Sequence, residues 1–325
     1  MPNNRVFYAN HGVSVNGQTV QGAQSVSVNT NFNIEQVFQL GRLAVYDTVQ
    51  VDPEVEVTIN KALDGHALIY SMAALTGDSL VEMAKDKSTI NLTVGDDTKK
   101  CLTDIGCNIQ MTGAYLSSLN YTLPVDGNFT EEITFISTHK GAGGLVAAPG
   151  AEPAADGAGG NKIVLRRQNF SNTSTIPATV TNAGNLSQIT ISADLGREAI
   201  YRLGQFAPYE RVVNFPVEIT VSFDVIATCT DGVFITGVDE DNNCSTPDFA
   251  DDNNTIQIKL CEEGGGIVYC FDLGTRCSLQ STSYSGGDTG GGNVTITYTY
   301  VSYNELAISS GDCSGEFADP TGCDW

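Results

Sequence analysis

Four glutamates are the acidic side chains whose spacing could carry chemistry. Glu54 and Glu56 alternate with valines in PEVEVTI, Glu218 takes the place of Glu56 in the later segment FPVEITV, and Glu132 lies in GNFTEEITF. Paired carboxylates serve as acid and nucleophile or base in glycoside hydrolysis. These acids, however, recur once in each half of the chain, on plain strand-like segments without an aromatic platform for a sugar. The pattern therefore favours a solvated strand face over a glycosidase.

The cysteines are the second group with chemical potential. The chain has nine of them and no C-x-x-C spacing, so neither a zinc ribbon nor a thioredoxin-like motif is indicated. Seven lie in the second half, where we expect disulfides; buried free thiols are the alternative. The odd number leaves at least one thiol unpaired or bonded between chains. The candidates, with the pairing open, are Cys101, Cys107, Cys229, Cys244, Cys261, Cys270, Cys277, Cys313 and Cys323.

No motif for a metal, a cofactor or catalysis is complete. DEDNN at Asp239 offers oxygen ligands for calcium, but the sixth and twelfth positions of an EF-hand loop, which require Gly and Glu, hold Cys244 and Ala250. A solvated acidic loop is preferred, with an irregular calcium site as the alternative. None of G-x-S-x-G, H-E-x-x-H or a Walker loop occurs. The sequence therefore predicts no metal site, no cofactor and no enzyme.

The elements that carry these residues have the period of β-strands. EVEVTI places Val55, Val57 and Ile59 on one face and polar side chains on the other, and VTITYTY near the C-terminus alternates in the same way. Gly-rich breaks such as EEGGG and SGGDTGGG are typical of hairpin loops. GDSLVEMAKDK favours a short helix, since Ser79 and Glu82 match a capping box, and the preceding GHALIYSMAALTG is compatible with a helix. We expect a mainly β, antiparallel fold with one short helix.

Two distant segments share many residues in the same order, with ten of 24 aligned positions identical: EQVFQLGRLAVYDTVQVDPEVEVTI and EAIYRLGQFAPYERVVNFPVEITV. The pairs TINLTV and TIQIKL, then GNFTEEITF and GNVTITYTY, continue the order downstream. We interpret this as a tandem duplication. The identical positions that define the repeat are Leu40 with Leu203, Gly41 with Gly204, Tyr46 with Tyr209, and Pro53 with Pro216.

The duplication predicts the domain organisation. Residues 1–140 form copy 1, the Gly/Ala/Pro segment 141–160 is a linker, residues 161–310 form copy 2 with Cys-rich acidic insertions, and residues 311–325 are a C-terminal tail. The formal net charge of −22 argues against tight nucleic-acid binding, which depends on Lys and Arg. No apolar stretch is long enough to predict a membrane span.

The order of these segments resembles the tail tube proteins of long-tailed bacteriophages, over residues 5–140 and 160–310. The resemblance implies β-sandwich or barrel domains whose inner sheets close into a ring by oligomerisation. Three duplicated chains would form each pseudo-hexameric ring, and stacked rings would form a conduit that DNA passes without tight binding. It further implies contacts with the sheath or tail tip and the tape measure, and a virion tail assembled in the bacterial host cytoplasm. Glu54, Glu56, Glu132 and Glu218 would then face the lumen.

Other readings stay open at this stage. A tube-end ring or a decoration protein of the virion would share the fold and differ in whether rings stack without limit. A secreted or surface adhesin made of two β-sandwiches predicts a soluble monomer. An enzyme of unrecognised type predicts a concave pocket with perturbed acids.

Overall fold

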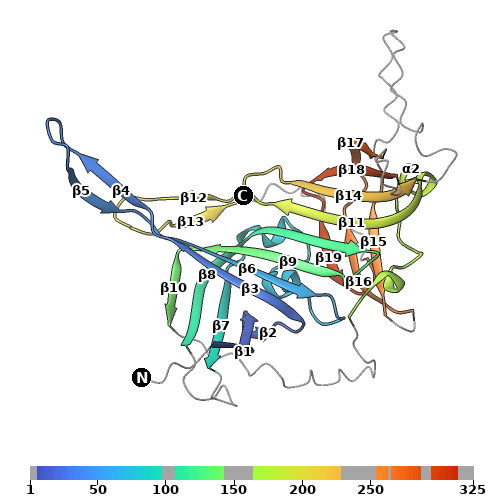
Figure 1. Ribbon diagram of the computed structural model, residues 1–325, viewed down its shortest axis with the longest axis horizontal. Helices are drawn as coiled ribbons and strands as arrows, with labels where there is room; N and C mark the ends of the chain where they lie inside the picture. Colours follow the sequence, from blue (N-terminus) through green and yellow to red (C-terminus); the bar gives the residue numbers. More distant parts are fainter. Residues whose placement is uncertain are drawn as a thin grey trace, which may run out of the picture.

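The fold is built almost entirely of antiparallel strands (Figure 1). The computed structural model of the chain describes residues 6–96, 107–142, 164–227, 254–262, 265–286 and 294–313. The predicted mainly β class is confirmed. The described helices are short, namely α1 (Ile69–Ala73), α2 (Ala178–Ala183) and the 3-10 turns η1 (Glu82–Lys85) and η2 (Arg167–Asn169). Neither α1 nor α2 has the length or hydrophobicity that a membrane span requires.

Eight strands form one continuous layer, here called the long sheet. Both halves of the chain contribute four strands, and β8 of the first half pairs with β11 of the second. This internal seam runs in register from Ser118 opposite Asp194 to Pro124 opposite Gln188. The order across the sheet is β3 (Ala23–Asn31), β6 (Glu54–Ala62), β9 (Thr130–Ser137), β8 (Cys107–Pro124), β11 (Gly184–Asp194), β14 (Glu218–Ala227), β18 (Thr295–Tyr303) and β17 (Ser278–Ser285).

The two halves of the long sheet have the same internal order. When the four strands of each half are numbered by their order along the chain, their order across the sheet is first, second, fourth, third in both halves. Irregularities in the register also coincide. In this order, the first pair of each half shifts at Gln24 in β3 and at Ser187 in β11, and the last pair shifts at Ser117 in β8 and at Gln280 in β17.

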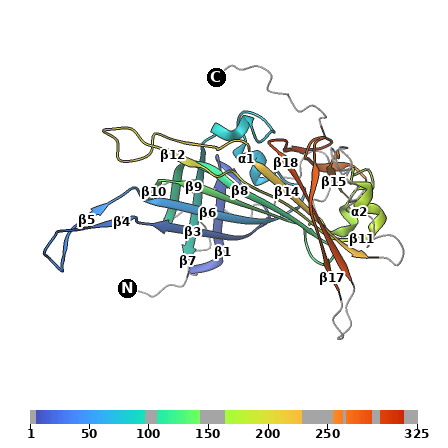
Figure 2. The same cartoon turned by 90° about the horizontal axis from the view of Figure 1, so that it is seen from above.

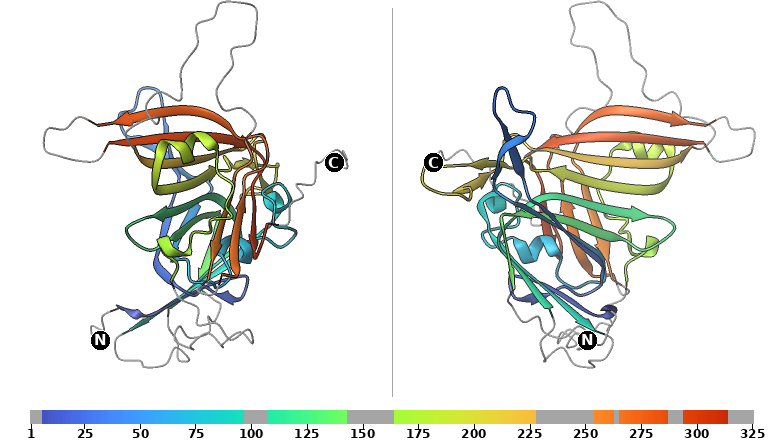
Figure 3. Two further views of the ribbon diagram at one scale, coloured as in Figure 1. Left: turned by 90° about the vertical axis from the view of Figure 1, so that its right-hand side faces the viewer. Right: turned by 60° about the vertical axis from the view of Figure 1, so that its left-hand side comes forward.

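Shorter strands form a second layer over the long sheet (Figure 3). In the first half, β7 (Ser88–Asp96) pairs with the beginning of β8, which also pairs with β10 (His139–Ala142). Beyond β7 lie β1 (Val6–Val15) and β2 (Gln18–Thr19). In the second half, β15 (Gln257–Cys261), β16 (Ile267–Asp272) and β19 (Ala307–Ser310) form a three-stranded sheet.

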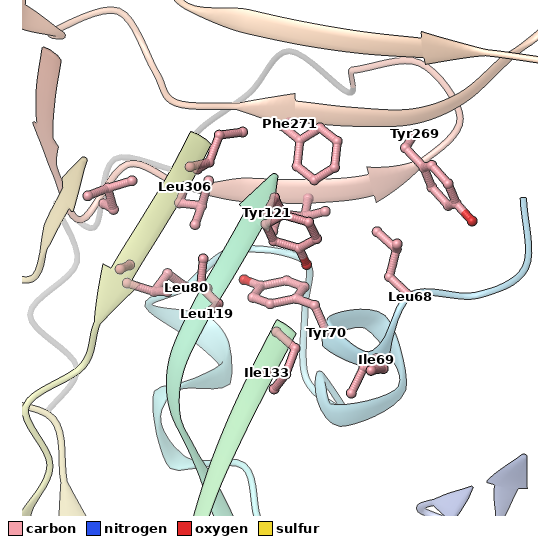
Figure 4. Packing of buried hydrophobic residues seen from close by; sticks show 14 of the residues in the cluster. Leu68, Ile69, Tyr70, Leu80, Leu119, Tyr121, Ile133, Tyr269, Phe271 and Leu306 are labelled. Atoms are coloured by element: carbon pink, nitrogen blue, oxygen red, sulfur yellow. The ribbon is translucent and has the colours of Figure 1, made fainter. Parts of the chain in front are cut away.

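The hydrophobic core lies between the layers and crosses the boundary between the halves. The predicted inward face of β6 is buried, with Val55, Val57 and Ile59 each at most 1% exposed. Tyr121 of β8 contacts Phe271 of β16 edge to face, with ring centroids 4.7 Å apart (Figure 4). One cluster of buried side chains contains residues of both halves, so the two halves fold around a shared core.

Two hairpins extend from one end of the long sheet (Figures 1 and 2). The first consists of β4 (Ile34–Phe38) and β5 (Val45–Gln50), and the second of β12 (Glu198–Ile200) and β13 (Glu210–Val212). Gly41 and Gly204 lie in the two connecting loops with φ of 83° and 88°, a conformation that glycine adopts without strain.

The segment predicted as a helix over residues 77–87 forms only the turn η1. The capping contact is present, since Ser79 Oγ lies 2.8 Å from Glu82 Oε2. Ahead of the turn, however, the backbone pairs with the second half: Ser79 lies opposite Ala307, and Leu80 N donates to Leu306 O. This tertiary pairing takes up backbone groups that a longer helix would need. Helix α2 was not predicted, and its three buried residues pack it into the core.

Candidate functional site

The solvent-facing side of the long sheet is polar along its whole width, and we call it the polar face. Hydroxyl and amide side chains dominate it, because these positions alternate with buried ones on inner strands such as β6, β9 and β11. It carries acids and neither lysine nor arginine on the eight strands. Its acidic residues are Glu54, Glu56, Glu132, Asp194, Glu218 and Asp224.

The structure brings the four predicted glutamates onto this one face. Glu54, Glu56 and Glu218 are exposed, and Glu132 is half-buried and accepts a hydrogen bond from Asn60 Nδ2 at 3.2 Å. Glu54 Oε2 also lies 3.9 Å from Arg211 Nη2, a buried guanidinium at the base of the second hairpin. The carboxylates are therefore spread over β6, β9 and β14 as parts of a surface.

Sequence reasoning missed two acids of the polar face. Asp194 ends β11, and Asp224 lies on β14 and accepts a hydrogen bond from Thr297 Oγ1 at 2.6 Å. Asp224 has the same strand parity as Glu218, so the alternation that selected Glu218 could have found it. Asp194 follows the same rule along β11.

Hydroxyl pairs connect neighbouring strands of the polar face at matching places in the two halves. Thr58 and Thr134 join β6 to β9 with their Oγ atoms 3.1 Å apart, and Ser222 and Thr299 join β14 to β18 at 3.5 Å. Such cross-strand contacts stabilise a sheet without closing a pocket. The resulting surface is hydrophilic and acidic, and it repels phosphate groups.

A buried polar cluster lies behind the polar face, and the sequence did not reveal it. Lys61 and Glu131 are both fully buried on neighbouring strands. Glu131 accepts hydrogen bonds from Tyr121 Oη at 2.9 Å and from the amides of Ile69 and Tyr70 at the start of α1. Burial raises the pKa of Glu131, and the Lys61 charge opposes this rise. The cluster anchors α1 to the sheet.

A second arginine, Arg197, fastens the second hairpin at the internal seam. Its guanidinium donates to Leu116 O and, at 2.8 Å, to Ala84 O, and it stacks on the Tyr115 ring at 4.8 Å. Burial lowers the pKa of Arg197 to about 10. These contacts hold the base of the hairpin against the first half of the chain.

Among the described cysteines, Cys270 and Cys313 form a disulfide that joins β16 to the residues after β19. Cys261 and Cys277 are free thiols, and burial raises the pKa of Cys277 to about 12. The side chains of the other candidates lie outside the described residues, as do DEDNN at Asp239 and the predicted linker beyond Ala142. The described part of the chain holds no cluster of three or more His, Cys, Asp or Glu that could bind a metal ion.

The residues that define the repeat gather around the hairpins. Leu40 and Leu203 are fully exposed at the two tips. Tyr46 on β5 and Tyr209 directly before β13 are exposed as well. Pro53 and Pro216 precede β6 and β14, where each hairpin returns to the long sheet. They are elements of a repeated architecture, and no catalytic group accompanies them at the tips.

Comparison with known proteins agrees with this architecture. Residues 6–136 match the family model of the Phi812 tail tube protein, a range that ends inside β9 of the first half. No curated protein sequence matches the chain. Residues 6–136, within the first half of the chain, are thus similar to phage tail tube proteins.

Proposed function

We propose that the chain is a structural subunit of a phage tail tube, and that three copies close into a pseudo-hexameric ring. One observation carries the proposal: the long sheet already contains two sets of four strands in the same order, joined at the internal seam. A tandem duplication accounts for the repeated order and for the matching register shifts. A ring follows when the same seam forms between chains.

The two edge strands of the long sheet could form such a seam by pairing between chains. In the described chain β3 pairs only with β6, and β17 only with β18, so each presents an unpaired edge. Because their register shifts match, β17 of the second half corresponds to β8 of the first half, and β3 of the first half corresponds to β11 of the second. Pairing β17 with β3 of a second copy then repeats the internal seam. Its register places Ser281 opposite Asn31, Ser283 opposite Asn29, and Ser285 opposite Ser27.

Exposed apolar side chains at these edges support the same pairing. At the internal seam, Leu195 is 1% exposed and its amide donates to Ser117 O at 2.9 Å. The residue in the place of Leu195 on the free edge is Phe32, which is 70% exposed. Closing the seam between chains would bury Phe32 beside Gln280 of the next copy and remove its apolar surface from water.

Ring closure gives the polar face its function. The eight strands of each chain would continue around the ring, and the polar face would line the lumen with hydroxyls and carboxylates. Such a wall lets DNA pass without the lysine and arginine contacts that hold phosphates. The subunit would act by assembly alone, in the virion tail built in the bacterial host cytoplasm, with itself, the sheath or tail tip and the tape measure as partners.

The test has two parts, electron microscopy of the purified chain and a designed cross-link. We expect rings with a sixfold outline and a central hole. The double variant Asn29→Cys with Ser283→Cys should form disulfide-linked dimers and trimers, because the pair faces the lumen across the predicted seam. The matched control Ser27→Cys with Ser283→Cys is diagonal in this register, beyond the usual span of a disulfide, and should cross-link poorly. Each single variant measures the background from native cysteines.

The outcomes separate the alternatives. Rings that never stack favour a tube-end ring or decoration protein. Monomers at every concentration would overturn the tube and favour the adhesin. Rings in which the control pair cross-links better than the predicted pair would keep the ring and reject this register.

A further inference from the structure

Two arginines lie side by side at the base of the second hairpin. Arg197 directly precedes β12 and Arg211 lies in β13, and Arg197 Nη1 donates to Arg211 O at 3.2 Å. Arg211 is 6% exposed and Arg197 is half-buried, although arginine is rarely removed from water unless it is paired. The first half of the chain contributes to this burial, because the Arg197 guanidinium stacks on the Tyr115 ring.

Three hydrogen-bonding groups of these residues have no acceptor among the described residues. They are Arg197 Nη2, Arg211 Nε and the hydroxyl of Tyr115, a residue that is 5% exposed. All three atoms are shielded from bulk water. A buried donor without a partner destabilises the folded chain, and the cost is larger when the donor is charged. Three such groups on residues that contact one another therefore indicate an acceptor that the described chain does not supply.

The charges around the two arginines indicate that this acceptor is an anion. Burial raises the pKa of Asp52, and the charge of Arg211 opposes this rise, so this buried carboxylate interacts with Arg211. Glu54 Oε2 lies 3.9 Å from Arg211 Nη2, but the Glu54 side chain is 47% exposed and water screens the attraction. Arg197 forms no ion pair with a described carboxylate, and its guanidinium contacts backbone carbonyls and the Tyr115 ring. One positive charge is thus left without a buried counter-charge.

We propose that a small monovalent anion of the halide class binds between the two guanidiniums and the Tyr115 hydroxyl. The site lies within one chain, so the inference does not depend on ring formation. Close packing favours a compact ion over a phosphate, since Arg211 and Tyr115 are almost completely buried. The anion would hold the base of the second hairpin against β8 of the first half. In the first hairpin the matching positions hold Ile34 and Thr48, so that hairpin lacks both arginines.

Unfolding of the full chain at different chloride concentrations tests the site. Urea is the denaturant, because guanidinium chloride would itself supply the anion, and methanesulfonate replaces chloride so that the ionic strength stays constant. Above the dissociation constant, each tenfold rise in chloride concentration should lower the unfolding constant about tenfold, as for one site present only in the folded chain. Bromide should act like chloride. An unfolding constant that changes with neither ion would overturn the proposal and leave water as the partner of these donors.

Three variants locate the anion. Arg197→Ile introduces the residue of the first hairpin and should abolish the chloride dependence. Tyr115→Phe keeps the ring and removes only the hydroxyl, and it should weaken chloride binding about tenfold or more. Arg202→Ile is the control and should respond to chloride as the wild type does, because Arg202 is exposed on the same hairpin and stacks on Tyr209. Unchanged chloride dependence in Tyr115→Phe, or in a folded Arg197→Ile chain, would reject the site.

Discussion

Tyr121 and Tyr284 occupy the same position on two strands that share a register shift, yet Tyr121 is fully buried and Tyr284 is 57% exposed. Tyr121 lies at the internal seam opposite Ile191 of β11, and its ring contacts Phe271 of β16. Tyr284 lies on the free edge strand β17. The difference in burial therefore marks the place where a second copy is expected.

Tyr284→Ala should weaken ring formation and leave the single chain as stable as before. An exposed side chain contributes within about 0.5 kcal/mol to the free energy of unfolding. Tyr121→Ala is the matched variant and should cost about 3–5 kcal/mol, as for other large buried aromatics. Denaturant unfolding and sedimentation velocity measure the two effects. A Tyr284→Ala chain that forms rings at wild-type concentration would contradict the predicted seam.

Lys61 and Glu131 should show strong coupling in a double-mutant cycle. Lys61→Val and Glu131→Ile introduce the residues found at the matching positions in the second half, Val225 and Ile296. Lys61→Val removes the positive charge that opposes the rise in the Glu131 pKa and should cost about 3–5 kcal/mol, whereas Glu131→Ile leaves Lys61 paired with Asp64, whose Oδ1 lies 3.4 Å from Lys61 Nζ, and should cost less. The double variant should be less destabilised than the sum by about 1–3 kcal/mol. Chemical denaturation gives all four free energies, and additive values would show that the two charges do not interact.

Stability should depend on pH through Glu131. Burial holds the pKa of this carboxyl above its ordinary value of 4.5, so the folded chain keeps the proton at a pH where the unfolded chain has lost it. The contribution of Glu131 to stability is therefore largest below pH 4.5 and falls as the pH rises through the folded pKa. Glu131→Gln does not titrate, and the difference in unfolding free energy between the two proteins should follow this course. A difference that stays constant with pH would exclude the titration of Glu131.

Loss of the Cys270–Cys313 disulfide should destabilise the second half. Cys270→Ser with Cys313→Ser removes a cross-link with a sequence separation of 43, for which about 2–4 kcal/mol is expected. Treating the wild type with a reductant should lower stability by the same amount. Cys261→Ser, which changes a free thiol, is the control and should respond to the reductant as the wild type does. Equal stability of the reduced and oxidised wild type would show that the disulfide contributes nothing.

Reversing charge on the polar face should create DNA binding in assembled tubes. Glu56→Lys adds a cation to each proposed lumen segment, and its affinity for DNA should fall steeply as salt concentration rises. Glu262→Lys makes the same change of charge on the loop between β15 and β16, outside the polar face. Filter binding at low salt should detect DNA only with Glu56→Lys. Equal retention by both variants would remove the polar face from the lumen.

Strand periodicity made part of the site predictable. Val55, Val57 and Ile59 alternate with Glu54 and Glu56, and this alternation selects the buried face from sequence alone. The same rule extends to Asp224, which the repeat-based reading overlooked. It could not identify the Lys61–Glu131 pair, because two charged residues far apart in sequence become partners only through the register of β6 with β9.

Local signals were less reliable where tertiary pairing competes with them. The capping contact between Ser79 and Glu82 forms as its residues predict. Only one turn follows, however, because Ser79 and Leu80 directly ahead of it pair with Ala307 and Leu306 instead of joining a longer helix. A local motif reports the local preference of the backbone. It does not predict which distant strand will form hydrogen bonds with the same backbone groups.

The sequence by itself determined the β class, the polar and apolar faces of its strands and the recurrence of one hairpin and strand in each half. These properties follow from side-chain alternation and turn residues, which act over a few positions. Only the tertiary structure decided that both halves share one sheet, that β3 and β17 are its free edges, and that both hairpins leave from the same end of that sheet. Strand order and register depend on contacts between residues far apart in the chain, and no local pattern specifies them.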